Sequence, residues 1–344
     1  MEHNLTGMAR VGEGMLRAAP LQHIPSLLTT LGVKPEKVLR AAGLPSGALS
    51  QPENIVPVSK AVSLMTACAA FTGRPHFGLL AGRGVVLAQY GLVGMRMMHA
   101  PTVGAALRGL VLSLHLNGRA MVPAISIRDR VAALSFSLYD DAIEGSFHAT
   151  DFTLASACAA VRALCGPRWA PAEVLVAHRA PVDVRPYRRF FKAPLRFGTN
   201  RSALLFSAAW LDRSVIGASP ALRKSVEQAV ADMLRQQDLE LTVRVRRALY
   251  SQFTQDDVSI EGVAGMLRLH KRTLNRRLAE QGTSFAKILG EVRFQIARQL
   301  LVETDLPFTE VAATLSYTDV SAFSRAFRSW AGMAPSVWRQ AHAP

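Results

Sequence analysis

Lys271, Arg272, Asn275 and Arg276 are the residues of this sequence whose types and spacing best suit a chemical task. In a helix they would share one exposed face. Arginine can donate two hydrogen bonds to guanine, asparagine pairs with adenine, and the remaining cations can hold phosphates. This face predicts contact with double-stranded DNA, although a single basic helical face is more commonly just solvated.

Two short helices must position this face. Apolar residues recur at i, i+3, i+4 and i+7 in the segment before it, at Ile260, Val263, Ala264 and Leu267. Residues 268–270 form a tight connection, and Leu274 and Leu278 mark the inner side of the helix that follows. This outline predicts a helix-turn-helix unit whose second helix carries the basic face.

The same outline returns further along the chain, with helical patterns over 307–315 and 320–328. Asp319 suits the N-cap of the last helix, and Phe323 and Phe327 face inward at i and i+4. The outward positions are Ser321, Ser324 and Arg325. A second unit weakens the interpretation that the first basic face is only solvated.

A helix over 287–301 is predicted between the units, because apolar residues keep helical periodicity there. They are Ile288, Val292, Ile296, Leu300 and Leu301. Such a helix spans roughly 22 Å at 1.5 Å per residue. With the width of the units added, the two second helices could enter major grooves one turn, about 34 Å, apart.

A longer set of positions agrees with one known signature. It comprises Gly282-Thr283-Ser284-Phe285, Arg293, Ala297-Arg298, Leu300-Leu301, Val311-Ala312, residues 323–328 (FSRAFR), Gly332, Pro335 and Trp338-Arg339. Over residues 240–340 the sequence resembles the double helix-turn-helix domain of the AraC/XylS family of bacterial transcription regulators. More weakly, residues 20–207, with Thr72-Gly73 and Phe77-Gly78-Leu79-Leu80, resemble the arabinose-binding-type effector domain of one branch of that family.

The resemblance implies which residues face the bases. In the first unit they are Lys271, Arg272, Asn275 and Arg276, and in the second they are Val320, Ser321, Ser324 and Arg325. For Arg325, phosphate contact and internal bonding are alternatives. The sequence departs from the family at Ser316, where a glycine usually precedes the aromatic residue, here Tyr317; a left-handed backbone there would cost about 1 kcal/mol. His270 replaces a small hydroxyl cap, which weakens that helix start.

Before residue 210 the patterns mix helices and strands. Residues 121–128 and 131–139 alternate apolar and polar side chains around a short turn, which predicts a half-buried hairpin. We therefore expect an α+β N-terminal domain followed by an all-α C-terminal domain with two helix-turn-helix units joined by a linker helix. The expected divisions are an effector-binding or dimerisation domain over 1–211, a linker over 212–239 and the DNA-binding domain over 240–344.

Composition excludes several classes of protein. The chain has 344 residues, 49% hydrophobic and 19% charged, so extended disorder is not expected. No membrane span, signal peptide, metal site or cofactor is predicted, and the three cysteines are expected to be buried thiols. Catalytic motifs such as a nucleophile elbow or a phosphate-binding loop are missing, so we predict no enzyme.

The net charge of +15 favours a polyanionic partner, but the excess lies mostly outside the proposed readers. Residues 162–247 hold 16 basic and 7 acidic side chains. That segment could extend the footprint on DNA, receive an anionic effector, or be ordinary surface. The sequence leaves these three open.

Together these features predict a cytoplasmic, sequence-specific regulator that responds to a small-molecule effector. Its partners would be promoter DNA and the effector, with a homodimer and RNA polymerase as further candidates. The competing hypothesis is a small-molecule-binding or catalytic N-terminal domain combined with non-specific, architectural DNA binding. Asn275 and Arg276 argue against it, because their side chains suit discrimination between bases.

Overall fold

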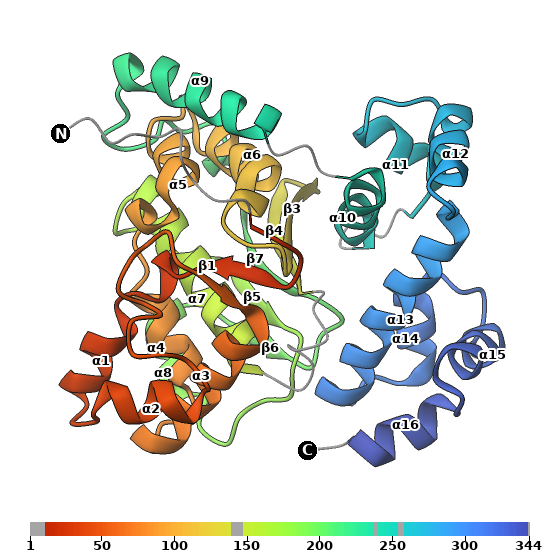
Figure 1. Cartoon of the computed structure of the whole chain (residues 1–344), viewed down its shortest axis with the longest axis horizontal. Coiled ribbons are helices and arrows are strands. Elements are labelled where there is room, and N and C mark those ends of the chain that lie inside the picture. The colour runs from red at the N-terminus through yellow and green to blue at the C-terminus, as the bar shows by residue number, and fades with distance from the viewer. Residues whose placement is uncertain (1–10, 139–146, 237–239, 254–257, 343–344) are drawn as a thin grey trace.

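The computed structural model describes residues 11–138, 147–236, 240–253 and 258–342, and Figure 1 shows its elements. The strands are β1 (Met15–Arg17), β2 (Ile55–Pro57), β3 (Met121–Arg128), β4 (Val131–Leu138), β5 (Glu173–Val176), β6 (Leu195–Phe197) and β7 (Ser202–Ser207). The helices of the first part are α1 (Ile24–Thr30), α2 (Pro35–Ala41), α3 (Val58–Thr72), α4 (Phe77–Arg83), α5 (Gly91–Met98), α6 (Val103–Ser113), α7 (Phe147–Cys165), α8 (Arg185–Phe191) and α9 (Pro220–Gln236). Those of the second part are α10 (Leu241–Phe253), α11 (Ile260–Met266), α12 (Lys271–Glu280), α13 (Phe285–Glu303), α14 (Phe308–Thr314), α15 (Val320–Ala331) and α16 (Pro335–His342).

A five-stranded sheet in the order β3-β4-β7-β5-β6 organises the first part. The predicted hairpin is present: β3 pairs antiparallel with β4, and Arg128 faces Val131 across the turn. Both turn residues, Asp129 and Arg130, have positive φ, as a two-residue hairpin loop requires. Only β5 and β6 pair in parallel among the strands of this sheet.

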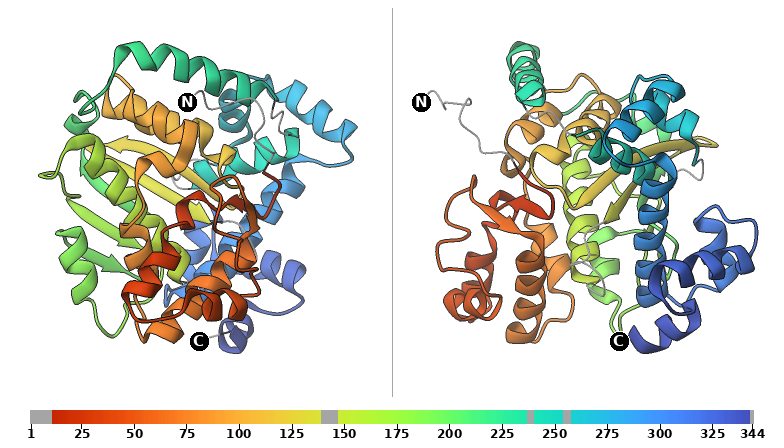
Figure 2. Two further views of the ribbon diagram at one scale, coloured as in Figure 1. Left: turned by 60° about the vertical axis from the view of Figure 1, so that its left-hand side comes forward. Right: turned by 45° about the vertical axis from the view of Figure 1, so that its right-hand side comes forward.

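The two faces of the sheet meet different partners. Ala132, Leu134 and Phe136 of β4 enter the main core, which contains residues of α6 and α7. Val122 lies on the opposite face, since it pairs with Ser137, and it packs in a cluster with α10. The C-terminal part therefore covers one face of the sheet at β3 (Figure 2).

Helix α9 occupies the segment expected as a linker. Its Val226 and Val230 are buried in the same core as the sheet and α6, and α9 packs on α5. Within residues 212–236 the chain thus belongs to the packing of the first part. The C-terminal part has its own clusters around α10 to α13 and around α13 to α16.

The fold class is confirmed: helices with a sheet come first, and every element in the described part of 240–344 is a helix. Cys68 and Cys158 are buried free thiols and Cys165 is half-buried. In the described ranges no single helix combines the length and apolar composition needed to cross a membrane. The bent pair Phe77–Arg83 and Leu87–Met98 meets both criteria only when taken together.

Candidate nucleic-acid interface

The first helix-turn-helix unit is built from α11 and α12. The Ser259 side chain caps α11 by accepting a hydrogen bond from the backbone N–H of Gly262, at 3.1 Å. Arg268 turns the chain with φ of 55°. Leu274 and Leu278 of α12 are fully buried, which fixes the rotation of this helix and leaves its basic side toward solvent.

His270 caps α12 in place of the expected small hydroxyl. Its Nδ1 accepts a hydrogen bond from the backbone N–H of Arg272 at 3.3 Å, longer than usual for such a bond. The expectation of a weakened helix start agrees with this long contact. The helix nevertheless begins at Lys271, where the sequence pattern places it.

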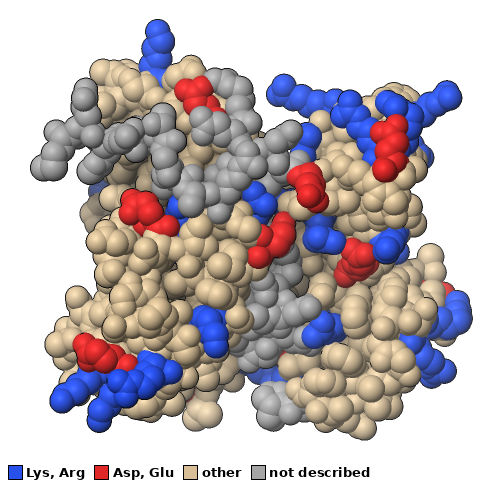
Figure 3. Space-filling view, in the orientation of Figure 1, with Lys and Arg blue, Asp and Glu red and all other residues tan. Residues whose placement is uncertain are grey.

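The four predicted residues of the first unit, Lys271, Arg272, Asn275 and Arg276, are all exposed on α12. Lys271 pairs with Glu261 at 2.6 Å and Arg276 with Glu280 at 2.8 Å. Exposed pairs of this kind contribute about 0–1 kcal/mol, so phosphates or bases can replace them at little cost. Figure 3 shows basic side chains gathered over this corner of the molecule.

The second unit consists of α14 and α15. Asp319 caps α15, its carboxylate accepting from the backbone N–H of Ala322 at 2.7 Å, and this bond lowers the pKa of Asp319. Phe323 and Phe327 are fully buried, as their spacing predicts. Of the four predicted residues, Ser321 and Arg325 are exposed, whereas Val320 and Ser324 are half-buried. The outer side of α15 is therefore less basic than that of α12.

Helix α13 joins the two units over 19 residues, which is roughly 28 Å at 1.5 Å per residue. It extends beyond the predicted 287–301 at both ends. Ser284 caps its start by accepting a hydrogen bond from the backbone N–H of Lys287. Residues of α13 enter the apolar clusters of both units. One rod thus sets the separation of α12 and α15 (Figure 1).

Three arginines to which the sequence pattern gave no role hold α13, the second unit and α16 together. Arg293 lies 4.5 Å from the Tyr317 ring and donates to the Ser316 carbonyl at 3.2 Å. Arg298 stacks 5.5 Å from both Phe294 and Trp338. Arg339 donates to the Leu306 carbonyl at 2.7 Å. Their place in the family signature was the signal that could have found them.

Arg179 connects the N-terminal part to the end of α13 by hydrogen bonds. The Arg179 guanidinium donates to the carbonyls of Val302 (2.6 Å) and Thr304 (3.1 Å) and to the Asp305 carboxylate (2.8 Å). Asn200 adds a 3.2 Å hydrogen bond to Thr314. These contacts, and the packing of Val122 against α10, involve other surfaces of the C-terminal part. The described residues therefore leave the outer faces of α12 and α15 uncovered.

The interior of the N-terminal part contains an apolar cavity of about 130 Å³. Its wall includes Val58, Met65, Leu114 and Phe152, with Arg17 as the charged residue. Helix α6 contributes mostly to the core rather than to this cavity.

Two family models match this chain. The model described as the arabinose-binding domain of AraC transcription regulators, N-terminal, matches residues 32–215. The helix-turn-helix domain model matches residues 263–341.

Relatives match nearly the whole chain. An ornithine utilization regulator of Pseudomonas aeruginosa is 29% identical over 329 residues, covering 92% of this chain and 93% of that protein. The HTH-type transcriptional regulator VirS of Mycobacterium tuberculosis is 25% identical over 328 residues, covering 94% and 96%. The crystal structure of the transcriptional regulator CdpR from Pseudomonas aeruginosa is 25% identical, covers 94% of this chain and 98% of that one, and aligns with a TM-score of 0.48.

Proposed function

The chain belongs to the AraC family of helix-turn-helix transcription regulators, and from this premise we propose that it recognises a promoter through α12 and α15 in successive major grooves. It is a DNA-binding regulator with an effector-type N-terminal domain. The proposal assigns base contacts to Lys271, Arg272, Asn275 and Arg276 in the first unit. In the second unit it assigns them to Val320, Ser321, Ser324 and Arg325.

One observation carries this assignment: the outer side of α12 is exposed and chemically available. Among the described residues, the side chains of Arg272 and Asn275 make no hydrogen bond or ion pair, while Leu274 and Leu278 lock the helix from behind. A donor set held rigidly and left unpaired is what direct readout of base edges needs.

The two units divide the work unequally in this proposal. The first has four exposed donors, whereas Val320 and Ser324 of the second are half-buried and offer little reach. We assign most of the base discrimination to α12. We assign to Arg325, which is exposed and makes no internal hydrogen bond in the described ranges, a contact to a base or a phosphate.

The proposal also covers partners and domain limits. We assign effector binding to the N-terminal domain, place the DNA-binding domain over 240–344, and assign the chain no catalytic activity. We extend the proposal to a homodimer, to RNA polymerase as a partner and to the cytoplasm, where a regulator of promoters meets its DNA.

The test compares Asn275→Ala with Gln281→Ala on the full chain. Both remove an exposed amide, but Gln281 lies after the last turn of α12. Genome-wide footprinting first provides the cognate site. We expect Asn275→Ala to weaken that site by about 1–3 kcal/mol, with little change on random DNA, and Gln281→Ala to change neither. Equal loss on cognate and random DNA would refute base readout and favour the architectural hypothesis.

A further inference from the structure

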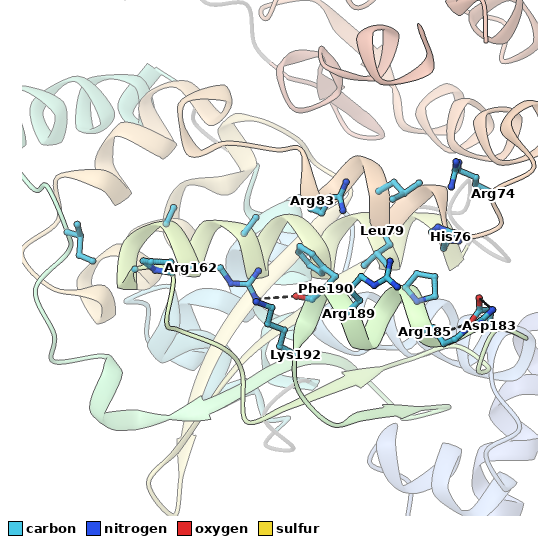
Figure 4. A pocket seen from close by; sticks show the side chains of 17 residues that line it. Arg74, His76, Leu79, Arg83, Arg162, Asp183, Arg185, Arg189, Phe190 and Lys192 are labelled. Carbon is cyan, nitrogen blue, oxygen red and sulfur yellow. Dashed lines mark hydrogen bonds and ion pairs between the residues drawn. The ribbon is translucent and has the colours of Figure 1, made fainter. Parts of the chain in front are cut away.

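A wide groove runs between α4, α7 and α8 on the N-terminal domain (Figure 4). Its volume is about 1020 Å³. Asp183 is the acidic residue in its wall. The six basic residues that line it are Arg74, Arg83, Arg162, Arg185, Arg189 and Lys192. Residues 162–247, whose excess positive charge the DNA-binding units do not explain, supply four of the six.

Most of this charge has no counter-ion among the described residues. Asp183 is taken by Arg185 through hydrogen bonds of 2.8 and 2.9 Å. In the described part of the chain, Arg74, Arg83, Arg189 and Lys192 make no ion pair. A concave, positively charged surface concentrates the electrostatic potential and attracts anions.

Helix α8 collects like charges on one side. Arg185, Arg189 and Lys192 follow each other at i, i+4 and i+7, so they share a face and repel one another. Lys192 also ends the helix with φ of 56°, a left-handed conformation that disfavours a side chain with a Cβ atom. An arrangement that costs stability at several adjacent positions is typical of a binding site.

The wall opposite α8 is rigid. Gly78 and Gly82 let α4 lie so close to α7 that an added Cβ would fall 2.3 Å from the His148 carbonyl oxygen and 2.4 Å from that of Phe152. On α7, Arg162 is fixed by hydrogen bonds to the carbonyls of Trp169 and Phe190, both at 3.3 Å, the second drawn in Figure 4. Of the six cations, Arg162 is therefore held in place before any ligand arrives.

We propose that this groove binds a small organic anion carrying two or more phosphate or carboxylate groups, and that it is the effector site of this regulator. The effector role rests on the proposed function, but the anion site does not. Guanidinium groups match the paired oxygens of phosphates and carboxylates. Leu79, Phe190 and Ile216 offer apolar surface to the organic body of the ligand.

The position of the groove favours a small molecule over DNA. Figure 1 places α4 and α8 in the left half of the molecule and α12 and α15 at the right edge. A duplex seated on the two recognition helices would lie on the far side from α8. The volume of about 1020 Å³ lies at the upper limit of small-molecule sites, which is about 1,000 Å³.

The test measures calorimetric binding of inorganic pyrophosphate and of citrate to the full chain without DNA. These two probes separate phosphate from carboxylate recognition. The groove variant is Arg83→Gln with Arg189→Gln, and the matched control is Lys37→Gln with Arg40→Gln, which removes the same charge from exposed positions of α2. Promoter binding is measured for both variants.

We expect saturable binding of at least one probe to the unmodified chain. The groove variant should weaken it by at least about tenfold, since charge-assisted hydrogen bonds are lost, while the control should change it less than about twofold. When no anion is present, the groove variant should bind the promoter as the unmodified chain does. A change in anion binding can then be interpreted independently of the base contacts assigned to α12.

Three results would overturn the proposal. The first is that neither probe binds saturably, and the second is that both variants weaken probe binding equally. The third is that the groove variant loses affinity for the promoter when no anion is present. The last result would make the groove part of the footprint on DNA.

Discussion

Replacing Ser316 by glycine should stabilise the second helix-turn-helix unit. Ser316 connects α14 to α15 with φ of 58°, the left-handed conformation that the family's usual glycine adopts freely. A residue with a Cβ atom loses roughly 1–2 kcal/mol there. Glycine is freer in the unfolded chain, which offsets about 0.4–1 kcal/mol. The net expectation for Ser316→Gly is a gain of about 0.5–1 kcal/mol.

The substitution should leave the hydrogen bonds of the described residues intact. The Ser316 side chain is exposed and makes no hydrogen bond in the described residues. Its backbone keeps both of its bonds, the N–H donating to the Ala313 carbonyl at 2.9 Å and the carbonyl accepting from Arg293 at 3.2 Å. The change in backbone strain is therefore the dominant effect.

The assay is hydrogen exchange by mass spectrometry on peptides from α14 and α15, supported by urea unfolding of the full chain. A gain of 0.5–1 kcal/mol corresponds to exchange about two- to fivefold slower. Ser316→Ala is the control, because it removes the hydroxyl but keeps the Cβ atom. Gly282→Ser is the reverse case, with φ of 71° and open space around the new Cβ, and should accelerate local exchange. Equal slowing by Ser316→Ala and Ser316→Gly would show that strain is not the cause.

Two further predictions concern Arg179, which makes the contact between the domains, and the adjacent His178. Arg179→Ala should weaken the contact between the domains by about 1–3 kcal/mol and thereby raise hydrogen exchange at the end of α13. Arg196→Ala is the control, because it breaks an ion pair with Glu173 inside the N-terminal domain and should leave exchange in α13 unchanged. Identical effects of the two variants would contradict the docking role of Arg179. Burial alone would lower the pKa of His178, but its 3.0 Å bond to Asp151 and the carboxylate charge prevail and raise it. This stabilisation is complete below the unfolded pKa of about 6.5 and is lost as the pH rises through the higher folded value. In the unmodified chain the free energy of unfolding should therefore decrease as the pH rises above about 6.5, and in His178→Gln it should decrease less steeply. An equal pH dependence in both proteins would exclude His178 as the cause of the decrease.

The C-terminal helices could be predicted because the residues that define each helix lie within its own short segment. Leu274 with Leu278 and Phe323 with Phe327 define the buried sides, and Asp319 marks a start. Such signals lie within a few residues of one another, so they survive without knowledge of the rest of the fold. The exposure of the predicted α12 residues follows from the same local pattern.

Other elements depend on contacts that a local pattern does not contain. Strand β7 was missed because its run over 203–206 is apolar throughout, as expected of a strand with neighbours on both edges and cover on its faces. Helix α4 was missed because Gly78 and Gly82 lower helix propensity, and only the close approach of α7 explains them. The sequence showed the excess charge of residues 162–247 but not the groove, because its cations come from three helices and from the loop before α4.

The groove and the domain contact share one segment of the chain. Arg179 lies between β5 and α8, a few residues before the helix that carries Arg185, Arg189 and Lys192. A ligand that binds α8 more tightly in one arrangement of this segment must shift the population toward that arrangement. By linkage, the docking of α13 then changes ligand affinity by the same factor. Since α13 sets the separation of α12 and α15, we expect such a shift to reach the DNA-binding units through the Arg179 contact.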